Sequence, residues 1–135
     1  KARRLKYEFE LDGLKIVFPV TTAAIKREGK ALAHCVGGYA ERHMRGVTTI
    51  LFLRRADQPH TPYVTLEMDG NRIRQIHGYH NDTLTGSPKP RVVHRAFLNT
   101  WLQWLQAGSK RNEDGTPKLP KRKKAVEHEG EARTA

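Results

Sequence analysis

The sequence has few of the features that mark secreted or membrane proteins. Cys35 is the single cysteine among 135 residues, so an internal disulfide is excluded. A cytoplasmic location is therefore the simpler expectation. No apolar run approaches the length of a membrane span, and no signal-peptide pattern opens the chain. We therefore expect a cytoplasmic protein without a membrane partner. The chain begins with Lys rather than Met, which predicts a fragment or a processed product.

Acidic residues are also scarce. The chain has 14 Asp and Glu against 25 Lys and Arg, which gives a formal net charge of +11. Such a surface favours polyanions, so nucleic acid is the expected partner and an acidic protein is the alternative. The sequence has no zinc-finger spacing and no aromatic ribonucleoprotein signature. Any contact with nucleic acid is therefore expected to be non-specific or to occur within a larger assembly.

Large apolar residues become rare near the C-terminus. From Gly108 onward the chain consists mainly of Ser, Gly, Pro, Lys, Arg and Glu, which bury too little surface to offset the entropy lost on ordering. The remaining length suits one hydrophobic core. We therefore predict a single domain over residues 1–107 and a basic disordered tail over residues 108–135.

The first half of the chain predicts a hairpin followed by helices. Apolar residues alternate through residues 7–18 on either side of Asp12-Gly13, the pattern of two strands and a tight turn. Thr21 or Thr22 can cap a helix that follows, and we expect Gly29 to break or kink it. A second helical stretch, interrupted at Gly37-Gly38, continues to Arg45. This pattern predicts a broken helical pair.

The second half predicts three strands and a helix. Residues 48–53 are β-branched, aromatic or aliphatic, as in a central strand buried on both faces. Residues 63–68 and 72–77 form a hairpin around Asp69-Gly70-Asn71. Apolar residues at helical spacing predict an amphipathic helix across the sheet: Val93, Phe97, Trp101, Trp104 and Leu105. The fold class is α+β, with a small antiparallel sheet made of the first hairpin and a three-strand meander.

The register of the second hairpin decides which polar side chains meet. With a two-residue loop, alternate residues from Val64 to Met68 share a face with Ile73, Gln75 and His77. With a three-residue loop, one face instead gathers four polar residues: Thr65, Glu67, Gln75 and His77. Both registers are compatible with the sequence.

The string from His34 to Tyr39 is the most unusual segment for chemistry. A cysteine at a helix boundary can have its thiol pKa lowered by the helix dipole and a nearby imidazolium, which would make Cys35 a nucleophile. With His77 as the base and Asn81 as the group that orients it, the set resembles that of cysteine hydrolases. A buried, inert Cys35 is the alternative. The glycines Gly37 and Gly38 would let backbone N–H groups approach an anion.

Metal binding is the less favoured interpretation of the same atoms. His34, Cys35, His77 and His80 are possible zinc ligands, yet they include one thiolate and lack the spacing of paired zinc ligands. We expect neither a metal nor a cofactor. The other histidines are expected at the surface: His43, His60, His94 and His128.

Two groups of basic residues are candidates for phosphate contact. The first lies on the predicted strands and comprises Arg54, Arg55, Arg72 and Arg74; the second is the tail cluster of Lys121, Arg122, Lys123 and Lys124. The tail cluster alternates with acidic residues and has no aromatic residue to stack on bases. Its charge could equally serve solubility.

Residues 25–82 resemble the PcfJ-like family in the order and spacing of several strings. These are Glu28-Gly29-Lys30-Ala31-Leu32, His34-Cys35-Val36-Gly37-Gly38-Tyr39, Thr49-Ile50-Leu51-Phe52-Leu53-Arg54, Pro62-Tyr63-Val64-Thr65-Leu66-Glu67 and Gln75-Ile76-His77-Gly78. The resemblance implies a role in bacterial mobile DNA, since members are encoded in conjugative plasmids, integrated elements and phages. It also implies a shared pocket that combines His34 and Cys35 with Gly37, Tyr39, Glu67, Gln75, Gly78 and Asn81.

Taken together, these patterns favour a nucleic-acid-associated accessory domain of a mobile element, with protein partners from the same element. A cysteine-dependent hydrolase or transferase is the alternative function, and a protein–protein adaptor is the third.

Overall fold

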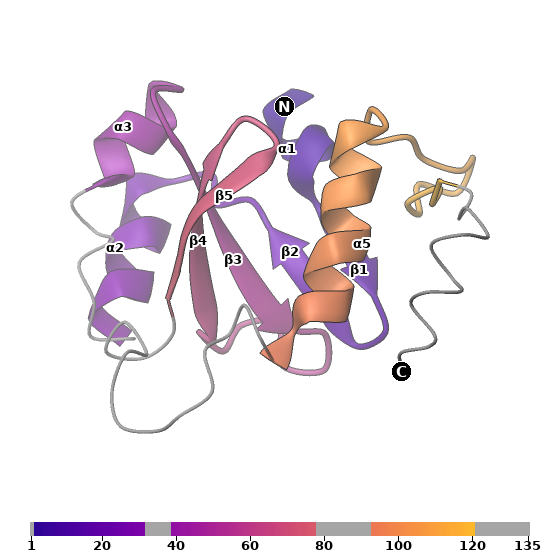
Figure 1. Ribbon diagram of the computed structural model, residues 1–135. Coiled ribbons are helices and arrows are strands. Elements are labelled where there is room, and N and C mark those ends of the chain that lie inside the picture. Colours follow the sequence, from indigo (N-terminus) through magenta and orange to yellow (C-terminus); the bar gives the residue numbers. More distant parts are fainter. Residues whose placement is uncertain (1, 32–38, 78–92, 121–135) are drawn as a thin grey trace.

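The computed structural model describes residues 2–31, 39–77 and 93–120. In these ranges the chain forms a five-stranded sheet in the order β1-β2-β3-β4-β5, and every neighbouring pair of strands is antiparallel. Helices lie on both sides of the sheet, with α2 and α3 on one side and α5 on the other (Figure 1). The predicted α+β class is confirmed.

The elements have the following bounds. The helices are α1 Ala2–Tyr7, α2 Thr22–Ala31, α3 Ala40–Met44 and α5 Arg95–Gln106, and the strands are β1 Phe9–Leu11, β2 Leu14–Val17, β3 Thr49–Arg55, β4 Val64–Asp69 and β5 Arg72–His77. The predicted first hairpin corresponds to β1 and β2. Its turn is made by Asp12 (φ 53°) and Gly13 (φ 85°), a left-handed pair that suits a two-residue hairpin loop. Because β2 also pairs with β3, the hairpin and the meander form one sheet.

The first helix is not foreseen by the sequence pattern, which places Tyr7 in a strand. Tyr7 instead ends α1. Arg3 donates hydrogen bonds to the carbonyl oxygens of His43 (2.9 Å) and Thr48 (3.0 Å), and Trp101 Nε1 donates to the carbonyl of Tyr7 (3.0 Å). A helix this short is marginal alone, so these distant partners explain why it forms.

The capping prediction for α2 is confirmed, but the predicted break at Gly29 is wrong. Thr21 Oγ1 accepts a hydrogen bond from the backbone N–H of Ala24 at 3.0 Å. The helix continues through Gly29 to Ala31. Ile25, Glu28 and Gly29 are all buried, and their packing outweighs the cost of about 1 kcal/mol for a glycine in a helix. The predicted interruption at Gly37-Gly38 lies outside the described residues.

The two faces of the sheet pack against different layers. The larger core joins β1–β5 to α5, and its largest fully buried side chains include Trp101, Trp104 and Leu51. On the opposite face, Ile50 and Phe52 of β3 pack with Ile25 of α2 and Ala40 as a smaller core. Strand β3 is buried on both faces, as predicted from its composition.

A β-bulge sets the register of the second hairpin. Asp69 pairs with Arg72 and Met68 with Ile73, so the loop is Gly70-Asn71. Beyond that point the register shifts, and Glu67 pairs with Gln75, which leaves Arg74 as the extra residue. The structure therefore has the two-residue loop of the first expected register. It also has the pairing of polar residues that was expected for a three-residue loop.

The predicted tail differs from the structure over residues 108–120. Ser109 Oγ donates to the carbonyl of Lys6 (2.7 Å), Arg111 donates to the carbonyl of Leu5 (2.7 Å), and Trp104 Nε1 donates to the carbonyl of Lys110 (2.6 Å). Hydrogen bonds to α1 and α5, together with the stacking of Arg111 on Trp104 (5.1 Å), replace the missing apolar burial. Residues 121–135 lie outside the described residues.

Candidate functional site

One face of the sheet lies beside α2 and α3. The half of that face that β4 and β5 form is polar. The bulge at Arg74 brings Gln75 opposite Glu67 and His77 opposite Thr65. Because antiparallel partners project from the same face, these four side chains lie together. Because the bulge accommodates Arg74, Gln75 rather than Arg74 lies opposite Glu67.

Glu67 is the centre of this cluster. Only 5% of Glu67 is exposed, and its carboxylate accepts hydrogen bonds from Thr48 Oγ1 (2.6 Å) and Gln75 Nε2 (3.0 Å). Arg74 lies 3.6 Å from the same carboxylate. Buried carboxylates need such partners, since an unpaired buried charge is costly. We call the connected set Thr48, Glu67, Gln75 and His77 the polar chain.

The polar chain also sets the tautomer of His77. Gln75 uses its amide N–H to reach Glu67, so its Oε1 is an acceptor. His77 Nε2 lies 3.0 Å from that oxygen and therefore donates to it. The basic nitrogen of the imidazole is then Nδ1. The hydrogen bond to Gln75 thus orients the imidazole ring of His77.

An ion pair between Glu28 and Arg54 lies buried between α2 and β3. Their side chains are 2% and 10% exposed. Arg54 also donates to the carbonyl of Pro59 (3.0 Å) and covers the ring of Phe52 (4.9 Å). Burial raises the pKa of Glu28 to about 7, against the opposing attraction of Arg54. The predicted phosphate contact at Arg54 is therefore wrong, because its guanidinium is committed inside the protein.

Two histidines predicted at the surface are not exposed. His43 is fully buried; its Nε2 donates to the carbonyl of Pro19 (2.9 Å), and its Nδ1 accepts from the backbone N–H of Ile50 (2.9 Å). Burial lowers the pKa of His43. His94 is half-buried, with Nε2 2.7 Å from Tyr63 Oη, and burial and Arg55 lower its pKa. Pro19 and Tyr63 lie 24 and 31 residues from the histidines that they contact, so no local signal identifies these pairs.

The other predicted contact residues have different environments. Arg72 is exposed on β5. Arg55 is exposed and stacks on Tyr63 at 4.5 Å, whereas Arg74 pairs with Asp69 at 3.5 Å as well as with Glu67. Tyr39 is half-buried at the start of α3.

Several predicted residues lie outside the described residues. They are His34, Cys35, Gly37, Gly38, Gly78, His80, Asn81, Lys121, Arg122, Lys123 and Lys124. The Cys35–His77–Asn81 constellation therefore stays a prediction. Within the described ranges, His, Cys, Asp and Glu do not gather in a group of three or more that could hold a metal ion.

Among the helices of the described ranges, none is both long and apolar enough to cross a membrane.

Comparisons with known proteins identify the family. An uncharacterized protein of Listeria innocua is 38% identical over 76 residues, a match that covers 55% of this chain and 17% of the relative. This chain thus corresponds to a small part of that longer protein. No solved structure matches. The family model described as PcfJ-like protein matches residues 1–90, and this chain therefore belongs to the PcfJ-like protein family.

Proposed function

We propose that this chain is a nucleic-acid-associated accessory domain of a bacterial mobile genetic element, and that the β5 edge of the sheet makes the contact. The observation that carries the proposal is the composition of this edge strand. Arg72, Arg74 and Gln75 are exposed along β5, and His77 is half-buried at its end. Arginine side chains suit phosphate oxygens.

The electrostatics of the chain favour the same partner. Among the described residues no carboxylate pairs with Arg72, so its charge is available to a ligand. The tail adds Lys121, Arg122, Lys123 and Lys124, and the chain as a whole carries a charge of +11. Membership of the PcfJ-like family supports the link to mobile elements.

A salt titration with a matched control tests the proposal. Labelled single-stranded and duplex oligonucleotides are titrated with the wild type, with R72A/R74A and with K26A/R95A, each double variant losing two exposed cations. We expect R72A/R74A to bind more weakly and its salt slope to fall by about 1 for each lost phosphate contact, whereas K26A/R95A changes little. Equal losses in the two variants, or binding that does not depend on salt, would refute a contact at β5.

A cysteine-dependent hydrolase or transferase is the second candidate. The observation that favours it is the fixed tautomer of His77, on the sheet face against which α2 and α3 pack. Residues 32–38, which include Cys35, connect those two helices in the chain.

Because Cys35 is the single cysteine, alkylation reports on it alone. We expect iodoacetamide at neutral pH to modify it faster than a free thiol, and H77A to slow that reaction, with C35A as the blank. A slow thiol that is insensitive to H77A would exclude this candidate. Failure of both this test and the salt titration would favour the adaptor.

A further inference from the structure

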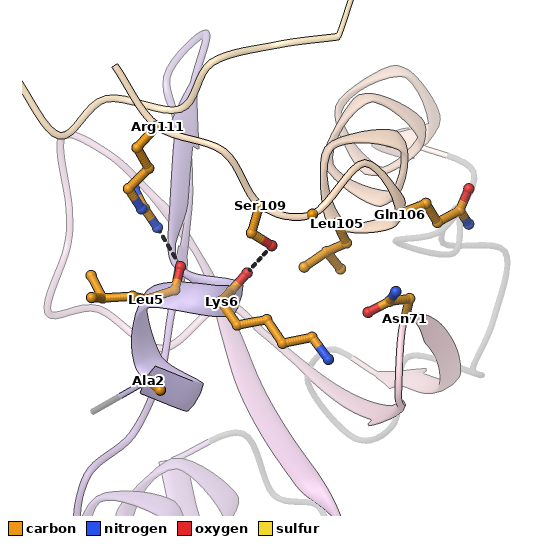
Figure 2. Close-up of a pocket in the computed structure, with 9 residues that line it drawn as sticks. Ala2, Leu5, Lys6, Asn71, Leu105, Gln106, Ser109 and Arg111 are labelled. Carbon is orange, nitrogen blue, oxygen red and sulfur yellow. Dashed lines mark hydrogen bonds between the residues drawn. The ribbon is translucent and has the colours of Figure 1, made fainter. Parts of the chain in front are cut away.

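A pocket lies between α1, the C-terminal end of α5 and the turn that joins β4 to β5. Its volume is about 710 Å³, within the range of small-molecule sites. Figure 2 shows that the lining residues come from segments far apart in the sequence, including Lys6, Asn71, Leu105 and Ser109. The pocket is therefore a product of the tertiary fold.

The segment after α5 forms one wall of the pocket. Gly108 (φ 103°) and Ser109 (φ 55°) both adopt left-handed conformations, which turn the chain back after the helix. Ser109 Oγ then donates to the carbonyl of Lys6, and Arg111 donates to the carbonyl of Leu5 (Figure 2). This wall is thus held to α1 by two hydrogen bonds from side chains.

The chemistry of the lining selects for an anion. Lys6 and Arg111 line the pocket, and its lining includes no aspartate or glutamate. The guanidinium of Arg111 already donates to backbone carbonyls of Leu5, Glu8 and Gly115. Lys6 is exposed and forms no ion pair with a described residue. Its ammonium group lies 5.1 Å from the centre of the Tyr7 ring, a contact that leaves its hydrogen-bond donors for a ligand.

Two further features favour a ligand with a planar polar body. Asn71 Oδ1 is buried and accepts no hydrogen bond from a described residue, and Figure 2 shows the Asn71 amide near the end of Lys6 and beside Leu105. The amide of an asparagine offers one acceptor and a donor group, the combination that recognises base edges. Leu5, which is 54% exposed, adds an apolar side chain at the pocket rim, on the opposite side of the Lys6 backbone from Asn71 (Figure 2).

We propose that this pocket binds a nucleotide, with Lys6 on the phosphate and Asn71 on the base edge. Arg72 follows Asn71 directly in the chain, so the pocket adjoins the β5 edge. The nucleotide is either free or the end of a strand that lies on β5. The proposal adds a second site to the proposed function and concerns different residues.

Calorimetric titration with 5′-mononucleotides at low salt tests the proposal, with the matching nucleosides and inorganic phosphate as reference ligands. We expect nucleotides to bind more tightly than either reference ligand. K6A should weaken binding by about tenfold or more, corresponding to one lost charge-assisted contact. A2W should weaken binding by occupying part of the pocket, and K110A, a neighbouring exposed lysine, should change it less than about twofold.

The outcomes separate this site from the β5 edge. No nucleotide binding, equal binding of inorganic phosphate, or wild-type affinity in both K6A and A2W would overturn the proposal, whatever the result of the oligonucleotide titration. If K6A weakens mononucleotides and also 5′-phosphorylated oligonucleotides, the ligand is a strand end. If K6A weakens mononucleotides alone, the ligand is a free nucleotide.

Discussion

The two faces of this sheet have different compositions although they share the same strands. The face against α5 is covered by apolar side chains from β1 to β5, with Trp101 and Trp104 fully buried. The face against α2 and α3 is apolar over β3 and polar over β4 and β5, where it carries the polar chain around Glu67. The comparison teaches that the larger apolar core lies on one face, whereas the other face holds buried polar groups that require hydrogen-bond partners.

The largest expected effect comes from breaking the α5 face. Trp101→Ala removes a fully buried indole and its hydrogen bond to the Tyr7 carbonyl, and it should lower the free energy of unfolding by about 3–5 kcal/mol. Urea denaturation followed by circular dichroism measures this loss. Gln103→Ala, at an exposed position of the same helix, is the control. A loss below about 1 kcal/mol would mean that the α5 face is not the main source of stability.

On the opposite face, His43→Ala should cost about 2–4 kcal/mol, because it leaves the Ile50 N–H and the Pro19 carbonyl without partners and opens a cavity. Urea denaturation again provides the measurement. His60→Ala, at an exposed histidine, should change stability by less than about 0.5 kcal/mol. Similar losses in the two variants would show that the buried hydrogen bonds of His43 contribute little.

The carboxyl of Glu28 should make this face sensitive to pH. Its pKa is raised to about 7 in the folded protein, so its contribution is fully present below the unfolded pKa near 4.5 and declines as the pH rises through about 7. Between these limits the wild type should lose on the order of 2–3 kcal/mol relative to Glu28→Gln. Urea denaturation at several pH values measures the difference.

Glu41→Gln, at an exposed position, is the control for this pH series. A constant difference between the wild type and Glu28→Gln across the range would contradict the raised pKa.

The smallest expected effect concerns Glu67 and Asp69, two carboxylates that both lie within ion-pair distance of Arg74. Glu67→Gln should cost about 1–2 kcal/mol, because its buried carboxylate also accepts from Thr48 and Gln75. Asp69→Asn should cost less than about 0.5 kcal/mol, since Asp69 is exposed. Thermal unfolding resolves the two variants. Equal shifts would mean that burial does not distinguish these carboxylates.

Local patterns were sufficient for much of the fold. Asp12-Gly13 predicted its turn, the composition of residues 48–53 predicted the central strand, and helical spacing predicted α5. The first helix and the ordered segment 108–120 were missed because their stability comes from hydrogen bonds to distant backbone groups. The sequence could not reveal those partners without the fold.

The residues of the candidate site could be predicted from the sequence, but their pairing across β4 and β5 could not. Glu67, Gln75 and His77 were identified from the sequence, but a strict alternation of faces allowed either register. A signal for the bulge was present, since Ile73 and Ile76 both pack toward the α5 core although they are three residues apart. Odd spacing of two core residues within one strand indicates an extra residue between them. His43 and Arg54 gave no comparable signal.

The bulge has a consequence for how this strand can change during evolution. Arg74 has no residue opposite it in β4, so it occupies the position of a one-residue insertion in β5. Deletion of Arg74 would restore regular pairing between β4 and β5, with Gln75 still opposite Glu67 and His77 opposite Thr65. Arg74 can therefore be exchanged or deleted without turning the neighbouring side chains to the wrong face, which makes the charge beside Glu67 adjustable independently of the fold.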